Sequence, residues 1–301
     1  MEAYTLDLEP FNGSHTAARI SERLEKKIEE YGLDDKTIRK YVTSDNGSNM
    51  LAALEQPSEE RRMDEEIAEI LRKSKSWEHL RCFDHTAQLA INDTKKEIGA
   101  NNVIDKVSKL VKRYHKSITA YENFKKFQKE HNLPDHDLIQ RVKTRWNSDF
   151  LMLQRATEQK LAIVSECCQA EEDHLTSNEW KLAEGFVEVL RPIADHTNDM
   201  GSENSPTSSM ILPTIFEIEH DLTEFIRRAP KGTGIQFARK LLSNAQERFH
   251  YYYGNDTYKT AMLLDPRYRN VLEDQNWMVS GESLLIEKAE ESYMQKQKNT
   301  I

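Results

Sequence analysis

The chain has 301 residues and a formal net charge of −9, with hydrophobic residues at 38% and charged residues at 31%. This composition is too apolar for a wholly disordered chain, and the acidic balance argues against one broad basic surface for nucleic acid. No run approaches the roughly 18 apolar residues of a membrane helix, and the first residues lack the basic and apolar regions of a secretory signal. Three cysteines, two of them adjacent, form no disulfide framework, which favours the cytoplasm or the nucleus.

The first hundred residues alternate between helix and strand patterns. A helix is expected from about Ser14 to Gly32, where apolar residues recur every three or four positions. Residues 38–43 read as a short strand that ends at Asp45, followed by a helix from about Ser48. A further helix is expected after Pro57, then a buried strand over residues 79–83 and another helix. This alternation is typical of an α/β layer.

Beyond Gly99 the strand patterns disappear and the rest of the chain is predicted to be helical. Pro192 is expected to end or kink one of these helices, and residues 199–209 are expected to form a polar link. Further helices are predicted over residues 210–225 and 235–249. The predicted fold class is α+β, predominantly α-helical: a partial α/β domain over residues 1–98 and an all-helical domain over residues 99–301.

Asp45 is the first candidate for chemistry. An aspartate before Asn46 and Gly47 is more often a turn or helix cap than an active-site acid. Its position at a strand end, however, is where metal-binding carboxylates emerge from α/β sheets. Two-metal phosphoryl transfer needs two or three such acids, so Asp45 alone does not make that site.

Cys82 and His85 have a spacing that could supply half of a zinc site. The only other suitably spaced pair is His131 and His136, which lies far along the chain. A structural zinc needs four ligands, so the preferred reading is a buried thiol and a hydrogen-bonded histidine. No metal and no cofactor is expected from these residues.

Residues 106–145 form the most basic stretch of the chain. It could face phosphates, although a solvated helix surface is the commoner explanation for such a run. The stretch closes with Lys143, Arg145 and Trp146, where a helix is expected to open. An aromatic ring beside cations is what stacking on an unpaired base requires, but core packing fits equally well.

Five motifs stand in order along the chain. They are Phe-Asn-Gly-Ser-His-Thr at residues 11–16, Thr-Ser-Asp-Asn-Gly-Ser-Asn-Met at 43–50, Arg-Cys-Phe-Asp-His at 81–85, Thr-Arg-Trp-Asn-Ser at 144–148 and Leu-Asp-Pro-Arg-Tyr at 264–268. This succession resembles the hAT family of DNA transposases and the BED-type zinc finger proteins derived from them. The resemblance covers almost the whole chain.

The resemblance implies an RNase H-like catalytic domain interrupted by a large helical insertion. Within it, Asp45 corresponds to the second catalytic acid, Cys82 and His85 to a pair near the active site, and Trp146 to a tryptophan that stabilises a flipped base. The family's first catalytic aspartate lies well before residues 11–16, and Asp7 is too close to His15 to be that residue. The family's last catalytic glutamate follows the helical insertion. We therefore expect only one of the three catalytic acids, Asp45, in this chain. Magnesium would bind only if the set were completed elsewhere.

These features favour a catalytically incomplete, transposase-derived nuclear protein. Its expected partners are DNA, through the basic stretch up to Trp146, and nuclear proteins, with no membrane. One alternative is an active transposase or nuclease completed by another chain. A second alternative is a helical interaction scaffold with no nucleic-acid role, which the acidic total charge favours.

Overall fold

The structure is a computed structural model that describes residues 10–33, 40–54, 78–142, 145–200, 207–228, 233–268 and 286–290. The chain divides into two compact units. Unit 1 comprises Met1–Thr86 and Glu282–Ile301, and unit 2 comprises Ala87–Gly281. The helix predicted after Pro57 lies outside the described residues, and the boundary predicted at residue 98 stays a prediction.

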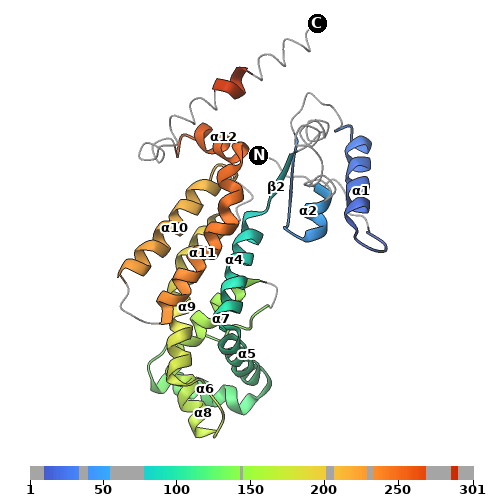
Figure 1. Ribbon diagram of the computed structural model, residues 1–301. Helices are drawn as coiled ribbons and strands as arrows, with labels where there is room; N and C mark the ends of the chain where they lie inside the picture. The colour runs from blue at the N-terminus through green and yellow to red at the C-terminus, as the bar shows by residue number, and fades with distance from the viewer. Residues whose placement is uncertain are drawn as a thin grey trace. The chain divides into compact units, whose positions relative to one another are not determined.

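Unit 1 contains two strands that pair in parallel, β1 (Tyr41–Ser44) and β2 (Glu78–Arg81), with Ser44 opposite Arg81. Helix α1 (Ala17–Glu30) packs against α2 (Ser48–Leu54), as Figure 1 shows. The strand, turn and helix predicted around Asp45 are confirmed. Both strands end at the same edge because they run in parallel.

Helix α4 (Phe83–Glu97) follows β2 directly and carries the chain into unit 2. In the described part of unit 2, every regular element is a helix. Its remaining helices are α5 (Asn101–Lys116), α6 (Ile118–Glu130), α7 (Trp146–Glu158), α8 (Lys160–Gln169), α9 (Ser177–Met200), α10 (Ile211–Arg228), α11 (Thr233–Gly254) and α12 (Asp256–Leu264). The predominantly helical α+β class is confirmed.

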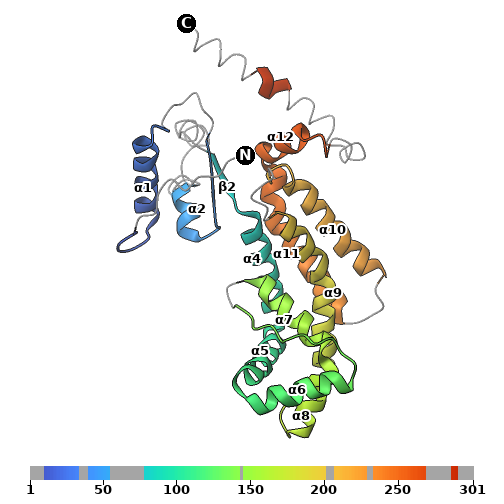
Figure 2. The ribbon, with the colours of Figure 1, turned by 180° about the vertical axis from the view of Figure 1, so that it is seen from behind.

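Three long helices, α9, α10 and α11, lie alongside one another in unit 2 (Figures 1 and 2). At their crossing, a side chain on Gly234 of α11 would meet the backbone of Gly185 in α9 at 3.4 Å. The two glycines therefore let these backbones approach closely. The helices bury a continuous apolar interior that includes Phe186, Phe237 and Tyr252.

Helix α9 decides half of one sequence prediction. Pro192 was expected to end or kink a helix; α9 runs 24 residues through it, so the helix does not end there. A kink at Pro192 stays a prediction. Proline removes one backbone hydrogen bond, and burial of the neighbouring Ile193 and Ala194 favours continuing the helix. Tertiary packing therefore outweighs the local preference here.

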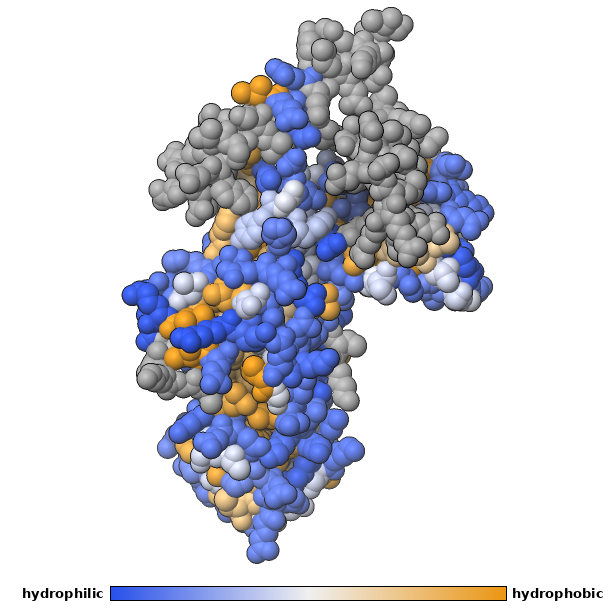
Figure 3. Space-filling view, viewed as in Figure 1, coloured by the Kyte–Doolittle hydropathy of each residue, from blue (hydrophilic) through white to orange (hydrophobic). Residues whose placement is uncertain are grey.

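The surface is mainly hydrophilic on the face drawn in Figure 3, with smaller apolar patches between the charged residues. No helix in the described part of the chain is both long and apolar enough to cross a bilayer.

Candidate functional site

Asp45 follows β1 at the sheet edge where both strands end. Its side chain is exposed, and its Oδ1 accepts a hydrogen bond from the Gly47 backbone N–H at 3.1 Å. This is an Asx turn, which leads the chain into α2 one residue later. The Asp45 carboxylate therefore makes the turn hydrogen bond that the neighbouring Asn46 and Gly47 predict.

Cys82 lies at the same edge as Asp45, because its backbone N–H donates to the Ser44 carbonyl at 2.9 Å and extends the ladder by one residue. Its own carbonyl accepts from Thr86 Oγ1 at 3.0 Å, and Thr86 Oγ1 accepts in turn from Asn46 Nδ2 at 2.6 Å. A hydrogen-bonded bridge thus ties the turn after β1 to the first turn of α4.

The Cys82 thiol is free and half-buried, and His85 is half-buried in the first turn of α4. In the described part of the chain, no three histidine, cysteine or acidic residues come together as a metal site requires. The other histidine pair has separate partners: His131 faces Ser165 Oγ at 2.8 Å, and His136 faces Glu158 at 3.0 Å. The structure thus brings Asp45 and Cys82 to one edge without assembling a ligand set around them.

Arg145 and Trp146 belong to unit 2, and Lys143 lies outside the described residues. Arg145 is exposed and immediately precedes α7, whereas Trp146 is the first residue of that helix and only 6% exposed. The Trp146 ring is therefore buried, as the core-packing alternative predicts. Stacking on a base would require Trp146 to leave this packing, and that role stays a prediction.

Ser148 holds the backbone at the corner where the chain enters α7. Ser148 Oγ lies 2.7 Å from the carbonyl oxygens of Val142 and Arg145 and accepts from the Val142 N–H at 2.9 Å. Arg145 itself occupies the N-cap position without a side-chain cap. The Arg145 side chain is exposed, so its guanidinium can reach a ligand.

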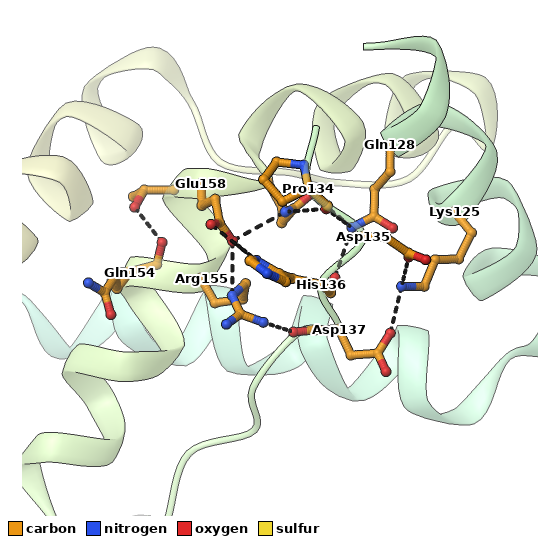
Figure 4. Close-up of polar contacts among 11 residues, drawn as sticks. Lys125, Gln128, Pro134, Asp135, His136, Asp137, Gln154, Arg155 and Glu158 are labelled. Carbon is orange, nitrogen blue, oxygen red and sulfur yellow. Dashed lines mark hydrogen bonds and ion pairs between the residues drawn. The ribbon is translucent and has the colours of Figure 1, made fainter. Parts of the chain in front are cut away.

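The described segment that follows α6, residues 131–142, is called the connector because it leads towards α7. Two buried glutamines hold its first half: Gln128 Nε2 donates to the His136 carbonyl at 2.8 Å, and Gln159 Nε2 donates to the Pro134 carbonyl at 3.0 Å. Figure 4 shows Gln128 of α6 and Arg155 and Glu158 of α7 converging on the connector. The amides replace backbone hydrogen bonds that an irregular segment lacks.

Ion pairs reinforce the connector from outside. Lys125 Nζ lies 2.7 Å from carboxylate oxygens of both Asp135 and Asp137. Partial burial lowers the pKa of Lys125, but hydrogen bonds to these two carboxylates outweigh it and raise that pKa above its ordinary value. Arg155 Nη1 also donates to the Asp137 carbonyl at 2.7 Å (Figure 4). The connector is therefore an ordered segment of the surface.

The second half of the connector rests on a buried charge network. Lys95 Nζ lies 2.8 Å from Asp149 Oδ2, and both side chains are 8% exposed. Arg141, 11% exposed, reaches the same carboxylate at 3.4 Å and Asp105 at 2.9 Å. Sequence reasoning missed this network, because its members are far apart along the chain and each alone looks like a surface charge.

Comparison with known proteins agrees with this architecture. Residues 80–189 match the family model described as the ZBED1 RNase-like helical domain. Human zinc finger BED domain-containing protein 4 is 30% identical over 194 residues, which is 63% of this chain and 16% of that protein. The chain is similar to a transposase and to BED-type zinc finger proteins. The resemblance seen in the ordered motifs is thereby confirmed.

Two further relatives show the range of proteins that share this hAT-related region. A Talaromyces stipitatus protein named as a transcriptional regulator is 24% identical over 263 residues, covering 77% of this chain and 29% of that protein. A Zea mays protein named as an AC transposase is 24% identical over 275 residues, covering 86% and 32%. The chain thus spans about a third or less of the length of each relative.

Proposed function

We propose that this hAT-related chain is a nuclear protein that binds nucleic acid without cutting it, as a transposase-derived regulator. The observation that carries the proposal is Arg145, an exposed cation that lies three residues beyond the connector, at the start of α7, in the most basic part of the chain. Relatives named as BED-type zinc finger protein and transcriptional regulator support the same class.

The arrangement around Asp45 supports the absence of cleavage. Two-metal phosphoryl transfer needs several carboxylates converging on one point. Asp45 instead accepts a hydrogen bond from the Gly47 N–H, and the described residues form no group of three ligand-type side chains. Asp45 is then a remnant acid whose present contribution is to the turn before α2.

The binding part of the proposal is tested by fluorescence anisotropy at low salt with hairpin, single-stranded and duplex DNA. Wild type should bind, and Arg145→Ala should bind several-fold more weakly. Arg239→Ala is the matched control, because Arg239 is also exposed and forms no ion pair in the described part of the chain. Absence of binding to all three DNA forms would remove nucleic acid from the proposal.

The catalytic part is tested with the same DNA in magnesium or manganese. We expect no strand cleavage from wild type. Cleavage that disappears in Asp45→Ala would instead establish the chain as a nuclease or transposase completed in trans. Microscopy of the full chain in cells checks the nuclear location, and exclusion from the nucleus would contradict it.

A second candidate is a helical scaffold for nuclear proteins. It is favoured by two apolar side chains in unit 2 that are unusually exposed, Ile118 at 78% and Leu161 at 54%. Pull-down from nuclear extract with and without nuclease separates the two functions. Partners kept after nuclease treatment support the scaffold, and partners lost support nucleic-acid binding.

A further inference from the structure

Several cations of the basic stretch are already paired with acids. Lys106 pairs with Glu179, Lys126 with Glu130, and Lys125 with two aspartates of the connector. Arg113 Nη2 donates to the buried Glu166 at 2.8 Å, and this hydrogen bond raises the pKa of Arg113 further above its ordinary value. Such charges are largely neutralised and have little to offer a phosphate.

Three lysines of α5 differ from this pattern. Lys109, Lys112 and Lys116 are exposed, and none has an ion-pair partner in the described part of the chain. Their spacing of three and four residues places them on one face of the helix. At 1.5 Å per residue they extend over about 10 Å of the helix axis. We call this row the α5 lysine stripe.

The buried face of α5 lies opposite the stripe and keeps the stripe lysines at the surface. Val103, Val107 and Val111 are each 4% exposed or less, and Tyr114 is 4% exposed. Burial raises the pKa of Tyr114 far above its ordinary value. Because this apolar face packs into unit 2, rotation of α5 cannot turn the lysines inward.

The connector meets the start of the stripe. Asp105 lies one turn before Lys109 on the same face of α5, and Arg141 of the connector binds its carboxylate at 2.9 Å. Gln140 Nε2 also donates to Ser108 Oγ at 3.0 Å. Arg141 thereby neutralises the acid at the head of the stripe and anchors there the segment that continues to Arg145. Both views of the ribbon place α5 beside α7, and the two helices are in contact (Figures 1 and 2).

We infer that the α5 lysine stripe is a track for a phosphodiester backbone that continues from the Arg145 corner. This inference rests on the proposed function and extends it from one corner to a surface of defined direction. The track binds by releasing counterions from the phosphates and reads no base sequence. The ligand chemistry is a chain of phosphodiesters, whether single-stranded or duplex.

The test uses the full chain with every stripe lysine replaced, Lys109→Ala, Lys112→Ala and Lys116→Ala together. The control triple Lys106→Ala, Lys126→Ala and Lys240→Ala removes the same charge from lysines that are paired with Glu179, Glu130 and Glu97. Affinity is measured by anisotropy from 50 to 200 mM salt with labelled single-stranded DNA and with a duplex of the same sequence. Circular dichroism checks that both triples keep the helical content of wild type.

The expected result is a change in salt dependence. Three lost phosphate contacts lower the slope of log affinity against log salt by about 2.7 for a duplex and about 2.1 for a single strand. Over this fourfold salt range, wild type should therefore lose about 40-fold more duplex affinity, or about 20-fold more single-strand affinity, than the stripe triple. The control triple should keep the wild-type slope. The DNA form that wild type binds more tightly at the same salt concentration is the preferred ligand.

Two failures are distinguishable. If wild type binds no DNA, the proposed function fails and the track fails with it. If wild type binds and Arg145→Ala weakens binding, but the two triples share one slope, the proposed function stands and the track is wrong.

Discussion

Removal of the Asp149 carboxylate should destabilise unit 2 far more than removal of a surface charge. Asp149→Ala leaves Lys95, 8% exposed, without its partner, and takes one of two carboxylates from Arg141. Breaking a buried ion pair from one side costs about 3–5 kcal/mol, because the remaining charge stays in a poorly solvated site. For a unit of this size the loss corresponds to a fall in Tm of about 6–20 °C.

Thermal unfolding followed by circular dichroism measures the effect in the full chain. The matched control is Lys106→Ala. The ion pair between Lys106 and Glu179 is more exposed and should contribute at most about 1 kcal/mol to stability. A double variant, Lys95→Met with Asp149→Leu, removes both charges and should recover most of the lost Tm. Equal shifts for Asp149→Ala and Lys106→Ala, or a double variant no better than the single one, would refute the reasoning from desolvation.

Three further variants probe the packing described above. Trp146→Ala should cost about 3–5 kcal/mol in urea unfolding, since the ring is 6% exposed; a loss below 1 kcal/mol would show that the ring leaves its pocket freely. Gly234→Val should lower Tm by several degrees because its side chain meets Gly185, whereas unchanged Tm would mean that α9 and α11 separate without cost. Hydrogen bonds from Arg267 hold the pKa of Asp265 well below its ordinary value of 3.8, so wild type should exceed Asp265→Asn in stability near neutral pH, with the difference shrinking as pH falls below 3.8. A difference that is constant or grows in acid would contradict that sign.

The sequence predicted those helices and turns that are determined by residues close together in the chain. The turn residues after β1 predicted the entry into α2, and the helical spacing of apolar residues predicted α10 and α11. Pro192 does not end its helix, because packing along α9 outweighs the local cost of a proline. A prediction from sequence considers only the backbone of the helix that contains the proline, whereas the contacts that keep this helix continuous come from other helices.

The candidate site was only partly predictable. The sequence identified Arg145 and the basic stretch, but it could not show which lysines of that stretch are paired with acids. Lys109 has no ion-pair partner among the residues that the structure describes, whereas Lys106 is paired with Glu179, which is 73 residues away in the chain. Long-range pairing of this kind leaves no periodic signal, so only the three-dimensional structure separates available cations from neutralised ones.

The two buried glutamines beneath the connector have a consequence for how this surface can change. Gln128 and Gln159 bind backbone carbonyls of the connector, not its side chains. Substitutions on the outer side of the connector can therefore alter its charge while the path of the chain stays the same. A surface built in this way can acquire a new ligand by exchanging side chains on a fixed frame, without a new fold and without first losing stability.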